Sequence, residues 1–114
     1  MPENKAFNVI VTQFAEDDLN EIVEYYNSLS PAYMEDVISK FESNILMLSE
    51  FPRNGRVIPE LHRQGIERYR EMIQGYYRIV YEVRELDVII YAIIDSRQNF
   101  EDIIITKLTR ILDK

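Results

Sequence analysis

The sequence predicts an α+β fold in which a helical hairpin packs on a small, mainly antiparallel sheet. In the first half of the chain, two stretches repeat apolar residues at helical spacing, whereas the second half holds three strand-length segments. The length of 114 residues suits one domain with one ordinary core, so we expect a single domain over residues 1–114. The predicted element order is β-α-α-β-β-β-α.

The first strand and the first helix lie close to the start of the chain. Residues Ala6–Thr12 are rich in β-branched side chains and predict a strand. Residues Ala15–Ser28 carry apolar side chains on one helical stripe, which predicts an amphipathic helix. Three acidic residues should lie in its first turn, where negative charge suits the helix dipole. They are Glu16, Asp17 and Asp18.

A second helix should follow the first after a very short link. Ser30 is a good N-cap residue, and Pro31 suits the first helical position. Apolar side chains then form one stripe as far as Ser49, and Phe51-Pro52 ends the helix. The two helices should therefore form an antiparallel hairpin.

Residues 52–66 show no periodicity, and we expect a loop there. Pro59 and Gly65 interrupt the segment, and charged residues lie between them. The single histidine of the chain, His62, is expected to be a solvated residue of this loop.

Three strands are predicted in the second half: Glu67–Ile73, Tyr76–Arg84 and Val88–Asp95. The middle strand alternates most clearly between its two faces. Val88–Asp95 is apolar on both faces, which is typical of a central strand covered on both sides. Phe100–Leu112 returns to helical spacing, so we expect a C-terminal helix, which either covers the open face of the sheet or reaches a partner.

The composition excludes several kinds of site. Cysteine is absent, which rules out disulfides, thiolate metal sites and thiol nucleophiles. With one histidine, a zinc centre is not expected. None of the three glycines falls in a nucleotide-binding motif, so we expect neither a metal nor a cofactor. Because the chain shows no secretory signal and no apolar run of membrane-spanning length, we expect a cytoplasmic protein.

The charge is divided unevenly along the chain. Residues 1–50 hold 10 acidic residues and 2 lysines, whereas residues 51–114 hold 10 acidic and 11 basic residues, including every arginine. An acidic protein should not bind nucleic acid nonspecifically, since phosphate neutralisation drives that binding. A local arginine patch can still bind phosphates or carboxylates through the guanidinium fork.

An ordered set of short motifs runs from about residue 7 to residue 100. It comprises Ala15-x-x-Asp18-Leu19-x-x-Ile22, Tyr25-Tyr26, Ser30-Pro31, Phe51-Pro52-x-x-Gly55-Arg56, Pro59-Glu60, Tyr69-Arg70-Glu71, Gly75, Tyr77-Arg78-Ile79-x-Tyr81 and Ser96-Arg97-Gln98. The set resembles the RelE/ParE toxin family of bacterial toxin–antitoxin modules. The loop that begins at Phe51 and the strand that begins at Tyr77 look more like the ParE branch, whose members are often labelled plasmid-stabilisation proteins.

The resemblance implies a toxin neutralised by a cognate antitoxin. ParE-like members inhibit DNA gyrase and are not nucleases. The function that we favour is therefore inhibition of an essential bacterial machine, such as DNA gyrase, by binding. The first alternative is a RelE-like, ribosome-dependent mRNA endoribonuclease that works without a metal. The second is a non-toxic orphan relative. Whether the chain is an enzyme is left open at this stage, although the acidic composition favours a protein that acts by binding.

Arg78 and Arg97 are the candidate site residues, because they match the family's strand arginine and the arginine after the last strand. Either guanidinium could contact a phosphate or a protein target. The alternative for Arg78 is an ion pair with Glu71 or Glu82 in the same sheet. RNA-cutting relatives often have a histidine near the position of Asp95 and a tyrosine near that of Phe100, and the predicted strands contain no lysine.

Overall fold

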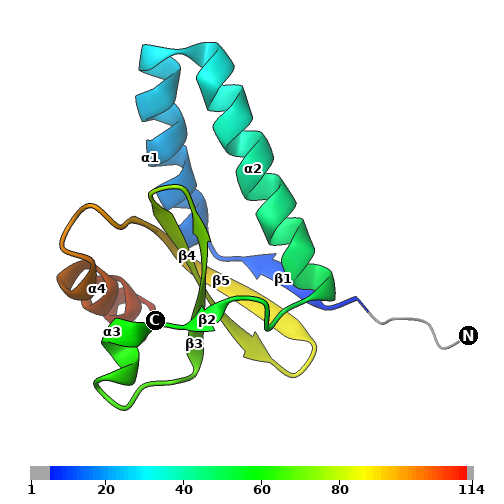
Figure 1. Cartoon of the computed structure of the whole chain (residues 1–114), viewed down its shortest axis with the longest axis vertical. Helices are drawn as coiled ribbons and strands as arrows, with labels where there is room; N and C mark the ends of the chain where they lie inside the picture. Colours follow the sequence, from blue (N-terminus) through cyan, green and yellow to red (C-terminus); the bar gives the residue numbers. More distant parts are fainter. Residues whose placement is uncertain (1–5, 113–114) are drawn as a thin grey trace, which may run out of the picture.

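The computed structural model describes residues 6–112 and confirms the predicted fold class. A five-stranded sheet separates a long helical hairpin on one face from two helices on the other (Figure 1). The elements are β1 (Asn8–Val11), α1 (Gln13–Leu29), α2 (Pro31–Glu50), β2 (Arg56–Val57), α3 (Pro59–His62), β3 (Tyr69–Gln74), β4 (Tyr77–Arg84), β5 (Asp87–Asp95) and α4 (Phe100–Leu112).

The sheet has the strand order β1-β5-β4-β3-β2. Strands β2 to β5 pair antiparallel with their neighbours, whereas β1 pairs parallel with β5, from Asn8 opposite Asp87 to Val11 opposite Ile90. The apolar strand β5 therefore has a neighbour on each edge and a helical layer on each face. This position explains why its sequence shows no polar face.

Capping residues set the N-terminus of each helix in the hairpin. The Thr12 hydroxyl accepts a hydrogen bond from Ala15 N at 3.2 Å and begins α1, and the Ser30 hydroxyl accepts one from Tyr33 N at 3.3 Å and begins α2. Pro31 takes the first position of α2, where a missing N–H has no cost. The hairpin predicted from these residues is confirmed.

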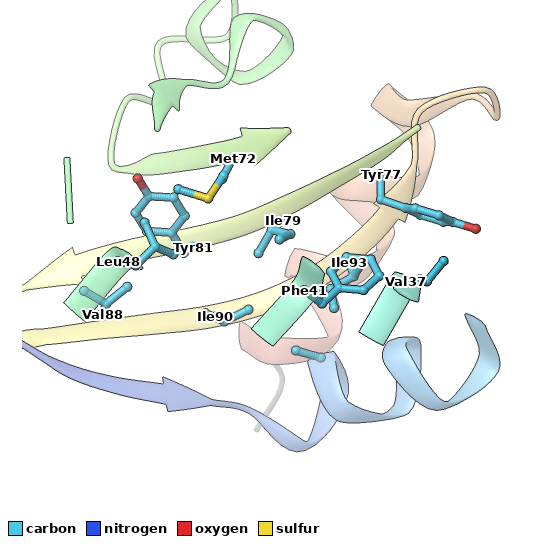
Figure 2. Packing of buried hydrophobic residues seen from close by; sticks show 11 residues of the cluster. Val37, Phe41, Leu48, Met72, Tyr77, Ile79, Tyr81, Val88, Ile90 and Ile93 are labelled. Carbon is cyan, nitrogen blue, oxygen red and sulfur yellow. The ribbon is translucent and has the colours of Figure 1, made fainter. Parts of the chain in front are cut away.

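The larger core lies between the hairpin and the sheet (Figure 2). Phe41 and Leu48 of α2 are fully buried there against Ile79, Tyr81 and other side chains of β4 and β5. Tyr81 belongs to this core, as the alternation of its strand predicts. A second cluster on the opposite face joins Ile104 and Leu108 of α4 to the other side of the same strands, so the C-terminal helix covers that face of its own sheet.

The loop predicted over residues 52–66 is corrected by the structure. It contains β2, which pairs with β3, and α3, which buries Leu61. Elements of two and four residues are too short to show a period, so the sequence carried no signal for them. His62 is the last residue of α3 rather than a loop residue, and its side chain is exposed 3.6 Å from Glu67.

Gly55 holds this segment against the sheet by close backbone contact. Its N–H donates to the Tyr81 hydroxyl at 2.9 Å, and its carbonyl accepts from Arg70 Nη1 at 2.8 Å. A Cβ atom at this position would lie 2.4 Å from both Glu71 O and Tyr81 Oη. The absence of a side chain is therefore required for β2 to reach its place beside β3.

We expect Gly55→Ala to lower the free energy of unfolding by about 2 kcal/mol, since overpacking a filled site costs roughly that much. Urea unfolding followed by circular dichroism measures the change. Gly75→Asn is the matched control, because Gly75 has a φ of 58° with open space around it and asparagine tolerates that conformation. Equal stability of Gly55→Ala and the parent chain would show that β2 can shift without cost.

Candidate functional site

Arg78 is held by two carboxylates beneath the C-terminal helix. Its guanidinium donates to Glu71 at 2.6 and 2.9 Å and to Glu60 at 2.7 and 2.9 Å. The same group lies over the Phe100 ring, 3.4 Å from the centroid, and its side chain is 9% exposed. The four hydrogen bonds use four of the five N–H donors that an arginine carries.

The strand register brings these groups together. Glu71 of β3 lies opposite Val80 of β4, so its side chain is two positions from Arg78 on the same face of the sheet. Glu60 reaches Arg78 from the first turn of α3, and Arg56 of β2 donates to Glu71 at 2.7 Å. The site is thus an ion-pair network of two arginines and two glutamates that joins β2, α3, β3 and β4.

The network changes the titration of its most accessible carboxylate. Hydrogen bonds from Arg78 lower the pKa of Glu60 below its ordinary value, although partial burial acts in the opposite direction. Burial alone would lower the pKa of Arg78, but its bonds to Glu60 and Glu71 outweigh that effect and raise it. Arg78 therefore stays charged and paired across the physiological pH range.

Arg97 lies in a more open place, in the turn between β5 and α4. It forms a two-point ion pair with Asp95 at 2.8 and 2.9 Å, and its guanidinium lies 4.2 Å from the centroid of the Tyr76 ring. The pair lowers the pKa of Asp95. Because its side chain is 51% exposed, Arg97 can exchange its partner for an incoming group, as Arg78 cannot.

The structure places the two candidate arginines in different surroundings. Arg97 lines a hollow of about 390 Å³ between α1, the end of β5 and α4, and Arg78 is not among its lining residues. Their role as contacts to a target stays a prediction. The proposed alternative for Arg78, a pair with Glu71, is present, and Glu60 is a second partner that no motif or spacing in the sequence indicated.

Asp18 is a polar residue whose position the sequence did not reveal. Of the three acidic residues expected in the first turn of α1, only Glu16 lies there, because the helix begins at Gln13. Asp17 and Asp18 lie beyond that turn, so the dipole interaction expected of Asp18 is not its role. Its carboxylate accepts from Ile93 N at 3.0 Å and from Lys107 Nζ at 2.5 Å. Because β1 turns into α1 after pairing with Ile90, Asp18 occupies the place of the missing neighbour strand beside β5.

Two further observations concern residues 6–112. No group of three or more histidine, aspartate or glutamate side chains in that range is arranged to hold a metal ion. None of the helices in that range combines the length and the apolar character that crossing a bilayer requires.

The fold of much of the chain is shared with proteins from solved toxin–antitoxin systems. One match is a chain from the chromosomal ParDE system of P. aeruginosa, with a TM-score of 0.65 and 16% identity over 78% of this chain and 95% of that one. Another is a chain from the RelBE2 toxin–antitoxin complex of Mycobacterium tuberculosis, with a TM-score of 0.55 and 21% identity over 83% and 97%. A search of curated proteins gave no significant match.

The family follows from the sequence of the same region. A family model described as the ParE toxin of the type II toxin–antitoxin system, parDE, matches residues 9–100. The chain belongs to the ParE toxin family. The resemblance found in the motifs between residues 7 and 100 is confirmed.

We expect Arg78→Met to lower the free energy of unfolding by about 3 kcal/mol, because it leaves Glu71 and Glu60 without their shared cation in a buried place. Arg97→Met is the matched control, and its exposed ion pair should leave the urea midpoint nearly unchanged. Urea unfolding of both variants tests the difference. Equal midpoints would mean that the buried network contributes no more than a surface pair.

Acid should weaken the protein through Glu60. Since its pKa is lowered in the folded state, the stability that it contributes is present above the ordinary value of 4.5 and is lost as the pH falls through the folded pKa. Glu60→Gln removes this titration, so its free energy of unfolding should fall less steeply with acid than that of the parent. Urea unfolding measured between about pH 6 and pH 3 gives both slopes. Parallel slopes would contradict the assignment.

Proposed function

We propose that this ParE-family toxin acts by binding an essential bacterial protein machine such as DNA gyrase, and that it does not cleave RNA. The observation that carries the proposal is the state of Arg78, whose guanidinium uses four of its five N–H donors on Glu60 and Glu71 and is stacked on Phe100. A group held in this way stabilises the fold and has little capacity left for a scissile phosphate.

The remaining groups near the end of the sheet also favour binding over cleavage. Metal-free RNA cleavage needs a base for the 2′-hydroxyl, a cation for the phosphate and an acid for the leaving oxygen. Asp95 and Phe100 stand where RNA-cutting relatives often supply a histidine and a tyrosine. Asp95 is bound to Arg97, which neutralises the one accessible cation of this turn. Protein binding requires none of these proton-transfer groups.

We assign contact with the target to Arg97. Its side chain is half exposed, its carboxylate partner is exchangeable, and the Tyr76 ring keeps the guanidinium at the surface. We assign Arg78 a role in stabilising the fold instead of a contact with the target. The proposal includes a cytoplasmic location, because gyrase and the antitoxin would both be met there.

A cognate antitoxin is the second partner that we propose. Its segment should lie along the helical hairpin and the sheet edge, as helix-in-groove and strand-addition modes allow. Helices α1 and α2 together carry nine acidic residues and one lysine, Lys40. We therefore expect the segment that covers residues 15–50 to be more basic than is usual for an antitoxin. An acidic segment bound there would contradict this expectation.

Expression of the chain alone in a bacterial host should arrest growth, and co-expression of the adjacent reading frame should relieve the arrest. The purified protein should inhibit DNA supercoiling by gyrase and leave ribosome-bound mRNA intact. Arg97→Ala should weaken inhibition about tenfold, as expected for losing one good charged contact. Arg84→Ala is the matched control, since Arg84 is another ion-paired arginine with more than half of its side chain exposed, and it lies at the end of β4.

Three outcomes would overturn parts of the proposal. Ribosome-dependent mRNA cleavage that Arg78→Ala abolishes without loss of the fold would establish the RelE-like function. Growth arrest without effect on supercoiling would exclude gyrase as the target. Unaffected growth would favour a non-toxic orphan that keeps the fold.

A further inference from the structure

Four tyrosines surround one small hollow at the junction of the hairpin and the sheet. The hollow has a volume of about 160 Å³ and lies between α1, α2 and the turn that joins β3 to β4. Figure 1 shows this turn rising beside the hairpin. The four rings belong to Tyr26, Tyr33, Tyr76 and Tyr77, and Asp36 and Lys40 add a carboxylate and an ammonium group to the lining.

The inner part of this group is fixed by packing. The Tyr77 hydroxyl donates to the Tyr26 hydroxyl at 3.2 Å, and the Tyr77 ring packs 5.7 Å from that of Phe41. The Tyr26 and Tyr33 rings lie 5.0 Å apart at an angle of 55°. The outer rings are open to solvent, with Tyr33 52% and Tyr76 59% exposed. Fixed inner rings and accessible outer rings make a preformed aromatic receptor.

The chemistry of the lining favours a cation. Tyrosine faces carry negative potential that attracts ammonium and guanidinium groups, and several rings around one point add their effects. Within this protein, the guanidinium of Arg97 already lies 4.2 Å from the Tyr76 ring centroid. Asp36 pairs with Lys40 at 3.1 Å, but both side chains are more than half exposed, so the carboxylate can exchange this partner for a ligand.

We propose that this hollow binds an arginine side chain from a basic segment of a partner protein. The planar guanidinium suits stacking between rings and a two-point contact with a carboxylate. The charge around the hollow selects a basic macromolecular segment over a lone small cation, because α1 and α2 carry nine acidic residues along their length.

The inference does not depend on the identity of the target. It requires an arginine-bearing protein partner and holds whether the toxin inhibits gyrase or another machine. Helix packing alone would explain the presence of a tyrosine at Tyr26. It would not explain the presence of tyrosines at Tyr33 and Tyr76, to which the inference assigns a role. The reason is that packing buries a side chain, whereas these two rings remain open.

An NMR titration tests the proposal on the full-length protein. The probe is the peptide Ac-Gly-Arg-Gly-NH2, added while the ring signals of isotope-labelled tyrosines are recorded. The signals of Tyr33 and Tyr76 should shift in a saturable way. The citrulline peptide Ac-Gly-Cit-Gly-NH2 has nearly the same shape without the charge. Its dissociation constant should be about tenfold larger than that of the arginine peptide.

Two substitutions separate stacking on the rings from nonspecific attraction. Tyr33→Leu keeps an apolar side chain and removes the ring, and it should weaken binding of the arginine peptide about fivefold. Tyr25→Ala is the matched control: Tyr25 is exposed on the same hairpin but lines a different hollow, so binding should stay at the parent value. Circular dichroism spectra equal to those of the parent confirm that each variant is folded.

Several results would overturn the proposal. Equal affinity for the arginine and citrulline peptides would show that charge plays no part. Parent-like binding by Tyr33→Leu, or equal losses in Tyr33→Leu and Tyr25→Ala, would show that the hollow is not the receptor. Tighter binding of tetramethylammonium chloride than of the arginine peptide would assign the hollow to a small quaternary cation instead. None of these results bears on growth arrest or supercoiling, so the proposed function is tested separately.

Discussion

The ion-pair network around Arg78 joins most of the elements on the α4 face of the sheet. Glu71 comes from β3, Glu60 from α3, Arg56 from β2, and the Phe100 ring covers the guanidinium from α4. A buried charge is tolerated only when its partners are complete, so each of these elements must take its place for the others to remain. The same requirement leaves Arg78 little capacity to bind a substrate phosphate. The packing of this face therefore favours an activity that depends on binding over one that cleaves RNA.

Most of the fold was predictable because its signals are local. Helical stripes, the Ser30-Pro31 cap and the two-sided apolar strand before Asp95 each depend on neighbouring residues, and each predicted element is present. The short β2 and α3 could not be predicted, since contacts such as that of Gly55 with Tyr81 hold them in place and leave no period. The site was harder to predict from the sequence than these two elements. Arg78 was identified from its motif, but its saturation by Glu60 depends on a contact between distant parts of the chain.

The division of charge along the sequence becomes a division in space. The acidic first half forms the hairpin on one side of the sheet, and the arginine-bearing half forms the strands and the segment around α3. On the strand side, carboxylates neutralise the cations Arg56, Arg78 and Arg97. On the hairpin side, most carboxylates have no cation within the same helices. The unbalanced negative charge of the molecule therefore lies on the hairpin.

The parallel pairing of β1 with β5 sets the order in which the protein can be completed during its synthesis. Residues 8–11 leave the ribosome first, yet their hydrogen-bonding partners are residues 87–90. Until β5 has emerged, the hairpin has only an incomplete sheet to cover, and the apolar side chains of Phe41 and Leu48 lack much of their core. The native sheet is therefore available only after β5 has left the ribosome, so the fold of residues 8–95 is completed late relative to the synthesis of its first strand.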